Sequence, residues 1–186
     1  MISKLKQDQE VKVYFEEESR IGLITTQRRR ITLKGVKPIG YKQYQHQSFW
    51  FYGAVEPYTG DSFFLELPTA DTQGFQCFLD AFSAQHPDCL NLLFLDQARF
   101  HSAQDLIIPD QMLLVPLPPH SPELNPMERI WEYLKDHLAW ELFRDLAHLS
   151  DTMCAIIQAL TKAPLKSLTY YPSIKLYFEP ETKETL

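Results

Sequence analysis

Residues 91–131 read NLLFLDQARFHSAQDLIIPDQMLLVPLPPHSPELNPMERIW, and this stretch decides the fold. It opens with a short apolar run that ends at Asp96, and a second apolar run follows at residues 112–115. Continuous apolar runs of this length are typical of strands that are buried on both faces and paired in parallel. The stretch closes on a predicted helix start at Pro126, with a second acid, Glu128, in its first turn.

Helical periodicity appears on both sides of this stretch. Apolar residues recur at helical spacing in residues 72–85, 126–138 and 146–160, which predicts three amphipathic helices. Asp71 with Thr72 is expected to cap the first of them, and His86-Pro87 is expected to end it.

The amino-terminal third predicts antiparallel strands. β-branched and aromatic residues fill 11–15 and resume at 21–25, which predicts a hairpin interrupted by three glutamates at 16–18. Two aromatic runs, at 48–55 and 62–67, predict a second hairpin. Hairpins followed by strands that alternate with helices define an α/β fold, with a mixed sheet and helices on both of its faces.

Residues 26–47 are basic and Gln-rich with two glycines and one proline, which predicts a long loop. The formal net charge of the chain is −6, so contact with the phosphates of DNA must be local. The loop holds the densest basic patch of the chain, which is either part of a solvated loop or a DNA contact. The patch consists of Arg28, Arg29, Arg30, Lys34 and Lys37.

Length and composition set further bounds. A chain of 186 residues with 45% hydrophobic content is large enough for one good core. Three widely spaced cysteines without a CxxC pair disfavour both a disulfide framework and a thiolate zinc site, and favour the cytoplasm. We find neither a signal peptide nor an apolar run long enough to span a membrane.

Three acids are candidates for one site, and each has a simpler alternative. Asp96 follows an interior strand, where open α/β sheets gather catalytic groups, but it is also placed to cap the next turn. Glu128 falls three positions after Asn125, as in a capping box. Glu17 belongs to a charge run, which is usually a solvated face. Acids from three distant segments are also what a hard divalent cation requires, so both interpretations stay open.

Three segments resemble the mariner-type (Tc/mariner superfamily) transposases, in particular those of bacterial insertion sequences. Residues 94–101, FLDQARFH, are similar to the family's LDNAxxH segment. Residues 117–135, LPPHSPELNPMERIWEYLK, are similar to LPPYSPxLNPIExxWxxLK. Residues 13–23, VYFEEESRIGL, are similar to its opening strand, xxFxDExRxGL. The resemblance covers nearly all of residues 11–165.

The resemblance implies an RNase H-like DDE catalytic domain at residues 1–165 and a carboxyl-terminal tail at 166–186. It implies that Glu17, Asp96 and Glu128 bind two Mg²⁺ or Mn²⁺ ions, with 128 − 96 − 1 = 31 residues between the last two acids. The family has Asp where this chain has Glu17, and the extra methylene is expected to impair activity.

Two further residues are expected to support these ligands from behind. They are Gln97, where the family has Asn, and His101, whose alternative is an ordinary surface or core histidine.

The function implied is metal-dependent DNA cleavage and strand transfer for a mobile element. The implied partners are double-stranded DNA at the element ends, a target that contains TA, and a second copy of the chain. Full transposases of this kind carry an amino-terminal helix-turn-helix domain, which we expect to be absent here, so a separate DNA-binding polypeptide is a further expected partner.

Two other functions remain open. One is an inactivated, transposase-derived binding or assembly module, which Glu17 favours. The other is a different RNase H-like nuclease, such as a junction resolvase or a nuclease of RNA–DNA hybrids, which would not explain the motif at residues 121–131.

Overall fold

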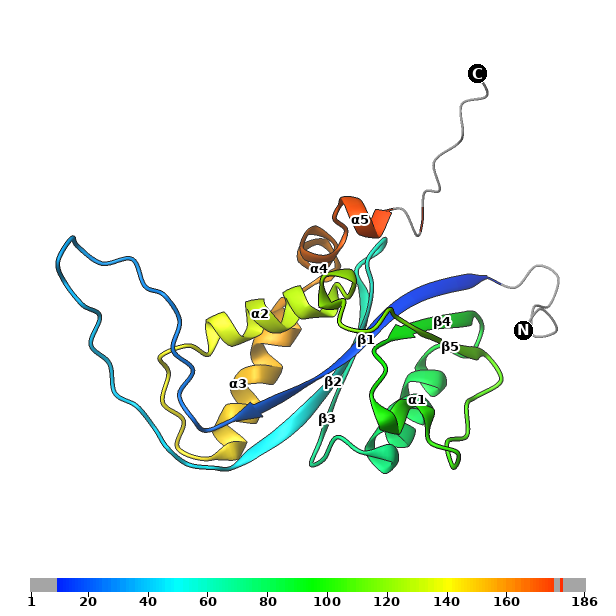
Figure 1. Cartoon of the computed structure of the whole chain (residues 1–186), viewed down its shortest axis with the longest axis horizontal. Coiled ribbons are helices and arrows are strands. Elements are labelled where there is room, and N and C mark those ends of the chain that lie inside the picture. The colour runs from blue at the N-terminus through cyan, green and yellow to red at the C-terminus, as the bar shows by residue number, and fades with distance from the viewer. Residues whose placement is uncertain (1–9, 176–177, 179–186) are drawn as a thin grey trace, which may run out of the picture.

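The computed structural model describes residues 10–175 and residue 178. Five strands form one sheet in the order β3-β2-β1-β4-β5 (Figure 1). The pairs β1–β2 and β2–β3 are antiparallel, whereas β1–β4 and β4–β5 are parallel. The predicted mixed sheet is therefore confirmed. The strands are β1 (Val11–Gly22), β2 (Ser48–Glu56), β3 (Asp61–Leu67), β4 (Leu90–Leu95) and β5 (Met112–Pro116).

Helices cover both faces of this sheet, as predicted. The helix α1 (Thr72–Gln85) buries Phe75, Phe78 and Phe82 against sheet residues that include Tyr14 and Tyr52. The other face carries α2 (Met127–His137), α3 (Leu146–Ala159) and α4 (Lys162–Thr169), which share a second core. Apolar side chains at helical spacing thus drive each helix onto one side of the sheet. The remaining short elements are η2 (Arg99–Ser102), η3 (Pro122–Leu124) and α5 (Pro172–Lys175).

The first predicted hairpin is wrong, because β1 is a single strand of 12 residues. The three glutamates at 16–18 lie inside β1, where they pair with Tyr52, Gly53 and Ala54 of β2. Alternation along the strand sends Glu16 and Glu18 to the α1 face and Glu17 to the α2 face. The three glutamates therefore do not break the strand, and they place carboxylates on both faces of the sheet.

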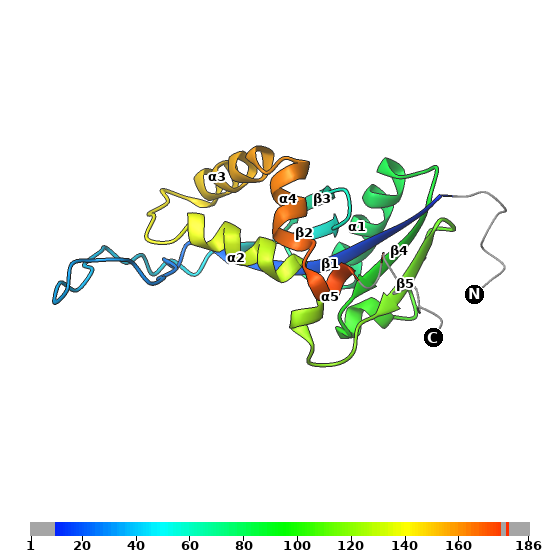
Figure 2. The same cartoon turned by 90° about the horizontal axis from the view of Figure 1, so that it is seen from above.

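A long loop connects β1 to β2, as predicted, and we call residues 23–47 the arm. It extends away from the body beyond the ends of these two strands (Figures 1 and 2). Trp140 anchors its base, since its backbone and indole N–H groups donate to the carbonyl oxygens of Thr26 and Arg28, both at 3.0 Å. Its outer part exposes several apolar side chains, namely Ile31, Leu33, Val36, Ile39, Tyr41 and Tyr44.

The carboxyl-terminal part differs from the expected tail. Residues 166–175 complete α4 and form α5, which lie beside α2 (Figure 2). Leu165 and Ile174 are buried at 2% and 0% exposure, so this part of the chain belongs to the packed core. The rest of the expected tail, apart from residue 178, lies outside the described residues.

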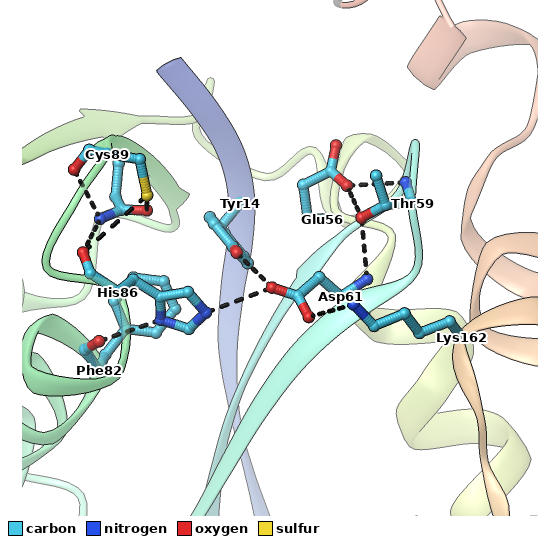
Figure 3. Close-up of polar contacts among 9 residues, drawn as sticks. Tyr14, Glu56, Thr59, Asp61, Phe82, His86, Cys89 and Lys162 are labelled. Carbon is cyan, nitrogen blue, oxygen red and sulfur yellow. Dashed lines mark hydrogen bonds and ion pairs between the residues drawn. The ribbon is translucent and has the colours of Figure 1, made fainter. Parts of the chain in front are cut away.

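A polar network connects the start of β3 to three other elements (Figure 3). The hydroxyl of Tyr14 donates to Asp61 Oδ2 at 2.7 Å, and His86 Nε2 lies 3.3 Å from the same oxygen. Lys162 Nζ lies 3.1 Å from Asp61 Oδ1. One carboxylate thereby joins β1, α1 and α4.

The structure also bears on the cysteines and on membrane-spanning segments. The three cysteines are free, with Cys89 buried and Cys77 and Cys154 exposed. Within the part of the chain that the structure describes, no helix is both long and apolar enough to cross a membrane.

Candidate metal-dependent active site

Three acids from distant parts of the sequence line one cavity of about 500 Å³. Glu17 comes from the middle of β1, Asp96 follows the last residue of β4, and Glu128 is in the first turn of α2. The structure therefore brings together the three acids that the sequence analysis selected. We call this space the acid cavity.

A glycine lets α2 approach the sheet at this point. Gly53 of β2 is the register partner of Glu17. A Cβ atom at Gly53 would lie 2.4 Å from Met127 Cε and 2.9 Å from Trp131 Cζ2, closer than real Cβ atoms come to their neighbours. The missing side chain thus lets the start of α2, with Glu128, pack directly over the strand that carries Glu17.

Asn125 connects β1 to the start of α2. Its side-chain amide donates to the carbonyl oxygen of Glu16 at 2.9 Å and to Glu17 Oε2 at 3.0 Å. Its Oδ1 accepts a hydrogen bond from the Met127 N–H at 3.1 Å. Since Asn125 is only 2% exposed, these bonds fix its side chain and orient the Glu17 carboxylate.

The capping box considered for Glu128 is not the arrangement found. The backbone N–H of Asn125, which such a box would direct to the Glu128 side chain, donates to the carbonyl oxygen of Pro122 at 2.9 Å. Glu128 is half-buried and lines the acid cavity. Its carboxylate thus remains available to a ligand there.

Asp96 combines both roles that were considered for it. Its Oδ1 accepts a hydrogen bond from the Ala98 N–H at 2.8 Å, so it caps the turn after β4. Its side chain is nevertheless 52% exposed at the acid cavity. The cap fixes the carboxylate without closing it to solvent.

His101 supports Asp96 from behind and is itself 3% exposed in its side chain. Its Nδ1 lies 3.1 Å from the backbone oxygen of Asp96 and 3.0 Å from Asp96 Oδ1. Its Nε2 lies 3.0 Å from Glu18 Oε1. Burial lowers the pKa of His101, but the contacts with Glu18 and then Asp96 outweigh it, so that the pKa is raised overall.

The acids raise one another's proton affinity. Burial, followed by the charges of Glu18, Asp96 and Glu128, raises the pKa of Glu17 to about 8. Burial, followed by the charges of Glu18 and Glu17, also raises the pKa of Glu16 well above its usual range. Crowded carboxylates of this kind favour either protons or a bound cation.

Gln97 lines the acid cavity, but its side-chain amide donates to the carbonyl oxygen of Leu117 at 2.9 Å. This bond connects the residue after Asp96 to the segment that follows β5. The supporting role expected for Gln97 stays a prediction.

The five basic residues expected to contact DNA lie on the arm and outside the acid cavity. Arg28 Nε is 3.0 Å from Asp136 Oδ1, so this arginine is already paired. The guanidinium of Arg30 lies 5.1 Å from the centre of the Trp140 ring. The side chains of Arg29, Lys34 and Lys37 are exposed.

Sequence reasoning missed two residues of this site. Asn125 was considered only as a helix cap, although its place in the motif at residues 117–135 was a usable signal. Glu18 was considered part of a charge run, and its contact with His101 depends on strand alternation that the predicted break concealed.

Comparisons with known proteins identify the family of this chain. The model of the DDE superfamily endonuclease family matches residues 12–150, and the chain belongs to that family. A relative from Sinorhizobium fredii (strain NBRC 101917 / NGR234), the uncharacterized protein y4pE/y4sA, is 35% identical over 122 residues, which cover 64% of this chain and 90% of the relative.

Among solved structures, the Mos1 transposase paired-end complex with left transposon end superposes with a TM-score of 0.68 at 13% identity. The Mos1 mariner paired end complex with Mn gives 0.69, also at 13% identity. Each comparison covers 90% of this chain and 54% of the Mos1 chain, so the chain spans about half the length of these proteins. The likeness shows that the fold is RNase H-like, as expected.

The acid cavity fits divalent ions. Carboxylate oxygens are the ligands that Mg²⁺ and Mn²⁺ prefer, and three carboxylates line this cavity. None of the described residues that line the cavity is a lysine or an arginine, so no side chain of these types neutralises the acids from within it. Burial and then the charges of the neighbouring acids raise the pKa of Glu17, and a bound cation would offset both effects.

Proposed function

We propose that this chain is the catalytic domain of a mariner-type transposase from a bacterial insertion sequence, which cleaves and joins DNA in a metal-dependent reaction. The observation that carries the proposal is that Glu17, Asp96 and Glu128, from three distant parts of the sequence, line one cavity. Membership of the DDE endonuclease family supports it.

In this proposal Glu17, Asp96 and Glu128 hold two Mg²⁺ or Mn²⁺ ions. Such a pair, when bound, activates the attacking water or 3′-hydroxyl and stabilises the leaving oxygen of the phosphodiester. The chain itself orients the ligands. Asn125 fixes Glu17 by a hydrogen bond at 3.0 Å, and His101 holds Asp96 from the side away from solvent. Asp96, the most exposed of the three acids, is the ligand best placed to contact both ions.

Double-stranded DNA is the proposed substrate, both at the ends of the element and at a TA target. Mos1 was solved in complex with a left transposon end, which supports DNA ends as the ligand class. The exposed basic residues of the arm, Arg29, Lys34 and Lys37, supply local positive charge on a chain whose net charge is −6. A separate polypeptide that recognises the element ends would complete the DNA contacts.

We further propose that the arm contributes to a homodimer. Ile31 and Ile39 are 104% and 95% exposed, and Leu33 and Tyr41 exceed 80%. Apolar side chains gathered on one extended segment are typical of surfaces that another protein covers. Sedimentation of the whole chain tests this proposal, since Ile31→Asp together with Ile39→Asp is expected to convert a dimer to a monomer.

The test of catalysis is nicking of a plasmid that carries the DNA flanking the gene. The wild-type chain, with the DNA-binding polypeptide supplied, is expected to nick it in Mg²⁺ or Mn²⁺, and Asp96→Ala is expected to abolish nicking. Asp151→Ala, on the exposed surface of α3, is the matched control for loss of an aspartate. Nicking that persists in Asp96→Ala would refute the assignment.

A second candidate function is an inactivated module that binds or assembles without catalysis. The observation that favours it is Glu at position 17, where the family has Asp. This candidate requires that Glu17→Asp gains no nicking and that the wild-type chain binds no Mn²⁺. The catalytic proposal instead expects Mn²⁺ binding by the wild-type chain, with nicking at least as fast in Glu17→Asp.

A further inference from the structure

A second cluster of ligand-type side chains lies behind the acid cavity, on the α1 face of β1. It consists of Glu16, Glu18 and His101, and one ligand atom from each lies within 4.8 Å of the others. Their side chains are 0%, 6% and 3% exposed. None of the three lines the acid cavity. We call them the buried cluster.

Glu16 is the member whose environment is unexplained. Both of its carboxylate oxygens are sealed from solvent, and no hydrogen-bond donor among the described residues reaches either of them. His101 Nε2 lies 3.8 Å from Glu16 Oε2, beyond hydrogen-bond distance. A buried carboxylate is strongly unfavourable unless it is paired, protonated or bound to a metal.

The histidine is oriented as a metal ligand is. Its Nδ1 faces two oxygens of Asp96, at 3.1 Å and 3.0 Å, which assigns the proton to that nitrogen. Nε2 faces Glu18 Oε1 at 3.0 Å, so this contact holds a proton in the metal-free chain, and a metal ion bound to Nε2 would displace that proton. Histidines that bind metals commonly donate the opposite N–H to a carboxylate or a backbone carbonyl, which is the arrangement here.

We propose that Glu16, Glu18 and His101 bind a divalent transition-metal ion of the Zn²⁺ type. Two carboxylates, a neutral imidazole and one such ion make a cluster without net charge, which removes the cost of burying the acids. The nitrogen ligand and the sealed surroundings select against Mg²⁺, which prefers oxygen and retains several waters. The ion would fix η2 to β1 and thereby hold His101 against Asp96.

This site is distinct from the proposed catalytic one in ligands and in access. The acid cavity is open and offers oxygen ligands to Mg²⁺ or Mn²⁺, whereas the buried cluster offers one nitrogen and is closed. The inference therefore does not depend on catalysis, and a chain that never cleaves DNA could still carry this ion.

Cobalt provides the test, because Co²⁺ replaces Zn²⁺ and gives a visible spectrum that reports its geometry. The whole chain is titrated with Co²⁺ in a large excess of Mg²⁺, which occupies the acid cavity. We expect one equivalent of Co²⁺ with the strong absorption of a four-coordinate site. Glu16→Gln, which keeps the shape of the side chain, is expected to lose this absorption, and Glu128→Gln, which alters only the acid cavity, is expected to retain it.

A crystal of the wild-type chain grown with Co²⁺ keeps the test independent of any variant that misfolds. Anomalous scattering is expected to place an ion about 2.0–2.1 Å from His101 Nε2. The proposal is overturned if the wild-type chain binds no Co²⁺ in excess Mg²⁺, if Glu16→Gln keeps the spectrum, or if the anomalous peak lies only between Asp96 and Glu128. Each of these results would mean that Glu16 holds no metal ion, and none would change the interpretation of the nicking assay.

Discussion

The side-chain amide of Asn125 donates a hydrogen bond to Glu17 Oε2 at 3.0 Å, across 108 positions of sequence. The same amide group contacts the backbone of Glu16, while its oxygen holds the first N–H of α2. One buried side chain thereby sets how the strand that carries Glu17 meets the helix that carries Glu128.

Asn125→Ala is expected to reduce both metal affinity and nicking. Loss of a side chain that orients a metal ligand typically costs about 10–100-fold in affinity or activity. The same substitution leaves the carbonyl oxygen of Glu16 and the Met127 N–H without their partner, so the free energy of unfolding should fall by about 1–3 kcal/mol. Calorimetric titration with Mn²⁺ and denaturant unfolding measure the two effects.

Ser121→Ala is the matched control for Asn125→Ala. Ser121 lines the same cavity, but its hydroxyl donates only to the carbonyl oxygen of Pro119, at 3.3 Å. Its Mn²⁺ affinity should stay within a factor of two or so of the wild-type value. Equal losses in the two variants would mean that Asn125 has no particular role in orienting Glu17.

Gly53→Ala is expected to move α2 away from the sheet. The added methyl group would meet Met127 and Trp131 at less than 3.0 Å, and overpacking of this kind costs about 1–3 kcal/mol. Because Glu128 is on the same helix turn, nicking should fall by more than the loss of folded protein explains. Ile130→Val, a small deletion on the buried side of α2, should destabilise by about 0.5–1.5 kcal/mol without this extra loss of activity.

These two contacts show what the sequence could and could not predict. The helix α1 and the strand β4 were predictable because the period of their apolar residues matches their burial, as Phe75, Phe78 and Phe82 illustrate. The three glutamates of β1 were not, since glutamate disfavours strands locally and the partner strand begins only at Ser48. Pairing across that distance overrides the local preference.

The candidate site was likewise predictable only in part. The motifs marked Asp96 and Glu128 because these residues lie in the two segments, 94–101 and 117–135, that resemble the transposase family. The contact between Asn125 and Glu17, and the space above Gly53, depend on the packing of α2 on the sheet. No local pattern of residues encodes such packing, so the sequence selected the acids but not the side chains that position them.

Metal binding should depend on pH in the direction set by Glu17. Its pKa is raised to about 8, so that this carboxyl is protonated in the metal-free protein at neutral pH. A metal must displace that proton, and the apparent Mn²⁺ affinity should rise about tenfold per pH unit up to pH 8 and then level off. Titrations between pH 6 and 9 measure this slope. An affinity that is constant over the range would contradict the assignment of Glu17 as a ligand.

The same shift predicts the stability of the metal-free chain. The folded-state pKa of Glu17 lies above its unfolded value of 4.5, so the folded state binds the proton more tightly. The resulting stability is fully present below pH 4.5 and is lost as pH rises towards 8. Saturating Mn²⁺ should reverse this trend, and Glu17→Gln should remove this contribution.

Asp61 should change the stability of the chain with pH in the direction opposite to Glu17. Partial burial raises its pKa, but hydrogen bonds from Tyr14 and Lys162 outweigh burial, so that the pKa lies below the usual 3.8. Its contribution to stability is therefore present above pH 3.8 and is lost as pH falls through the lowered pKa. Asp61→Asn should cost about 1–2 kcal/mol at pH 7 and progressively less below pH 3.8, as measured by urea unfolding.

Lys162→Ala distinguishes the buried part of this network from its exposed part. The Lys162 side chain is 69% exposed, so its ion pair with Asp61 should contribute about 0–1 kcal/mol. Tyr14 is fully buried, and its hydroxyl depends on Asp61. A larger loss of stability in Lys162→Ala than in Asp61→Asn would contradict this prediction, because it would mean that the exposed ion pair with Lys162 stabilises the fold more than the buried contact with Tyr14 does.

The arginines of the arm should differ in their effect on DNA binding. Arg29 is exposed, whereas Arg28 is paired with Asp136 at 3.0 Å. A side chain that contacts phosphate releases about one counterion, so Arg29→Ala should lower the slope of log affinity against log salt by about 1. Arg28→Ala should change this slope less, because its charge is already compensated. Binding of a labelled duplex at several salt concentrations measures both slopes, and a larger change for Arg28 would mean that its ion pair opens on DNA.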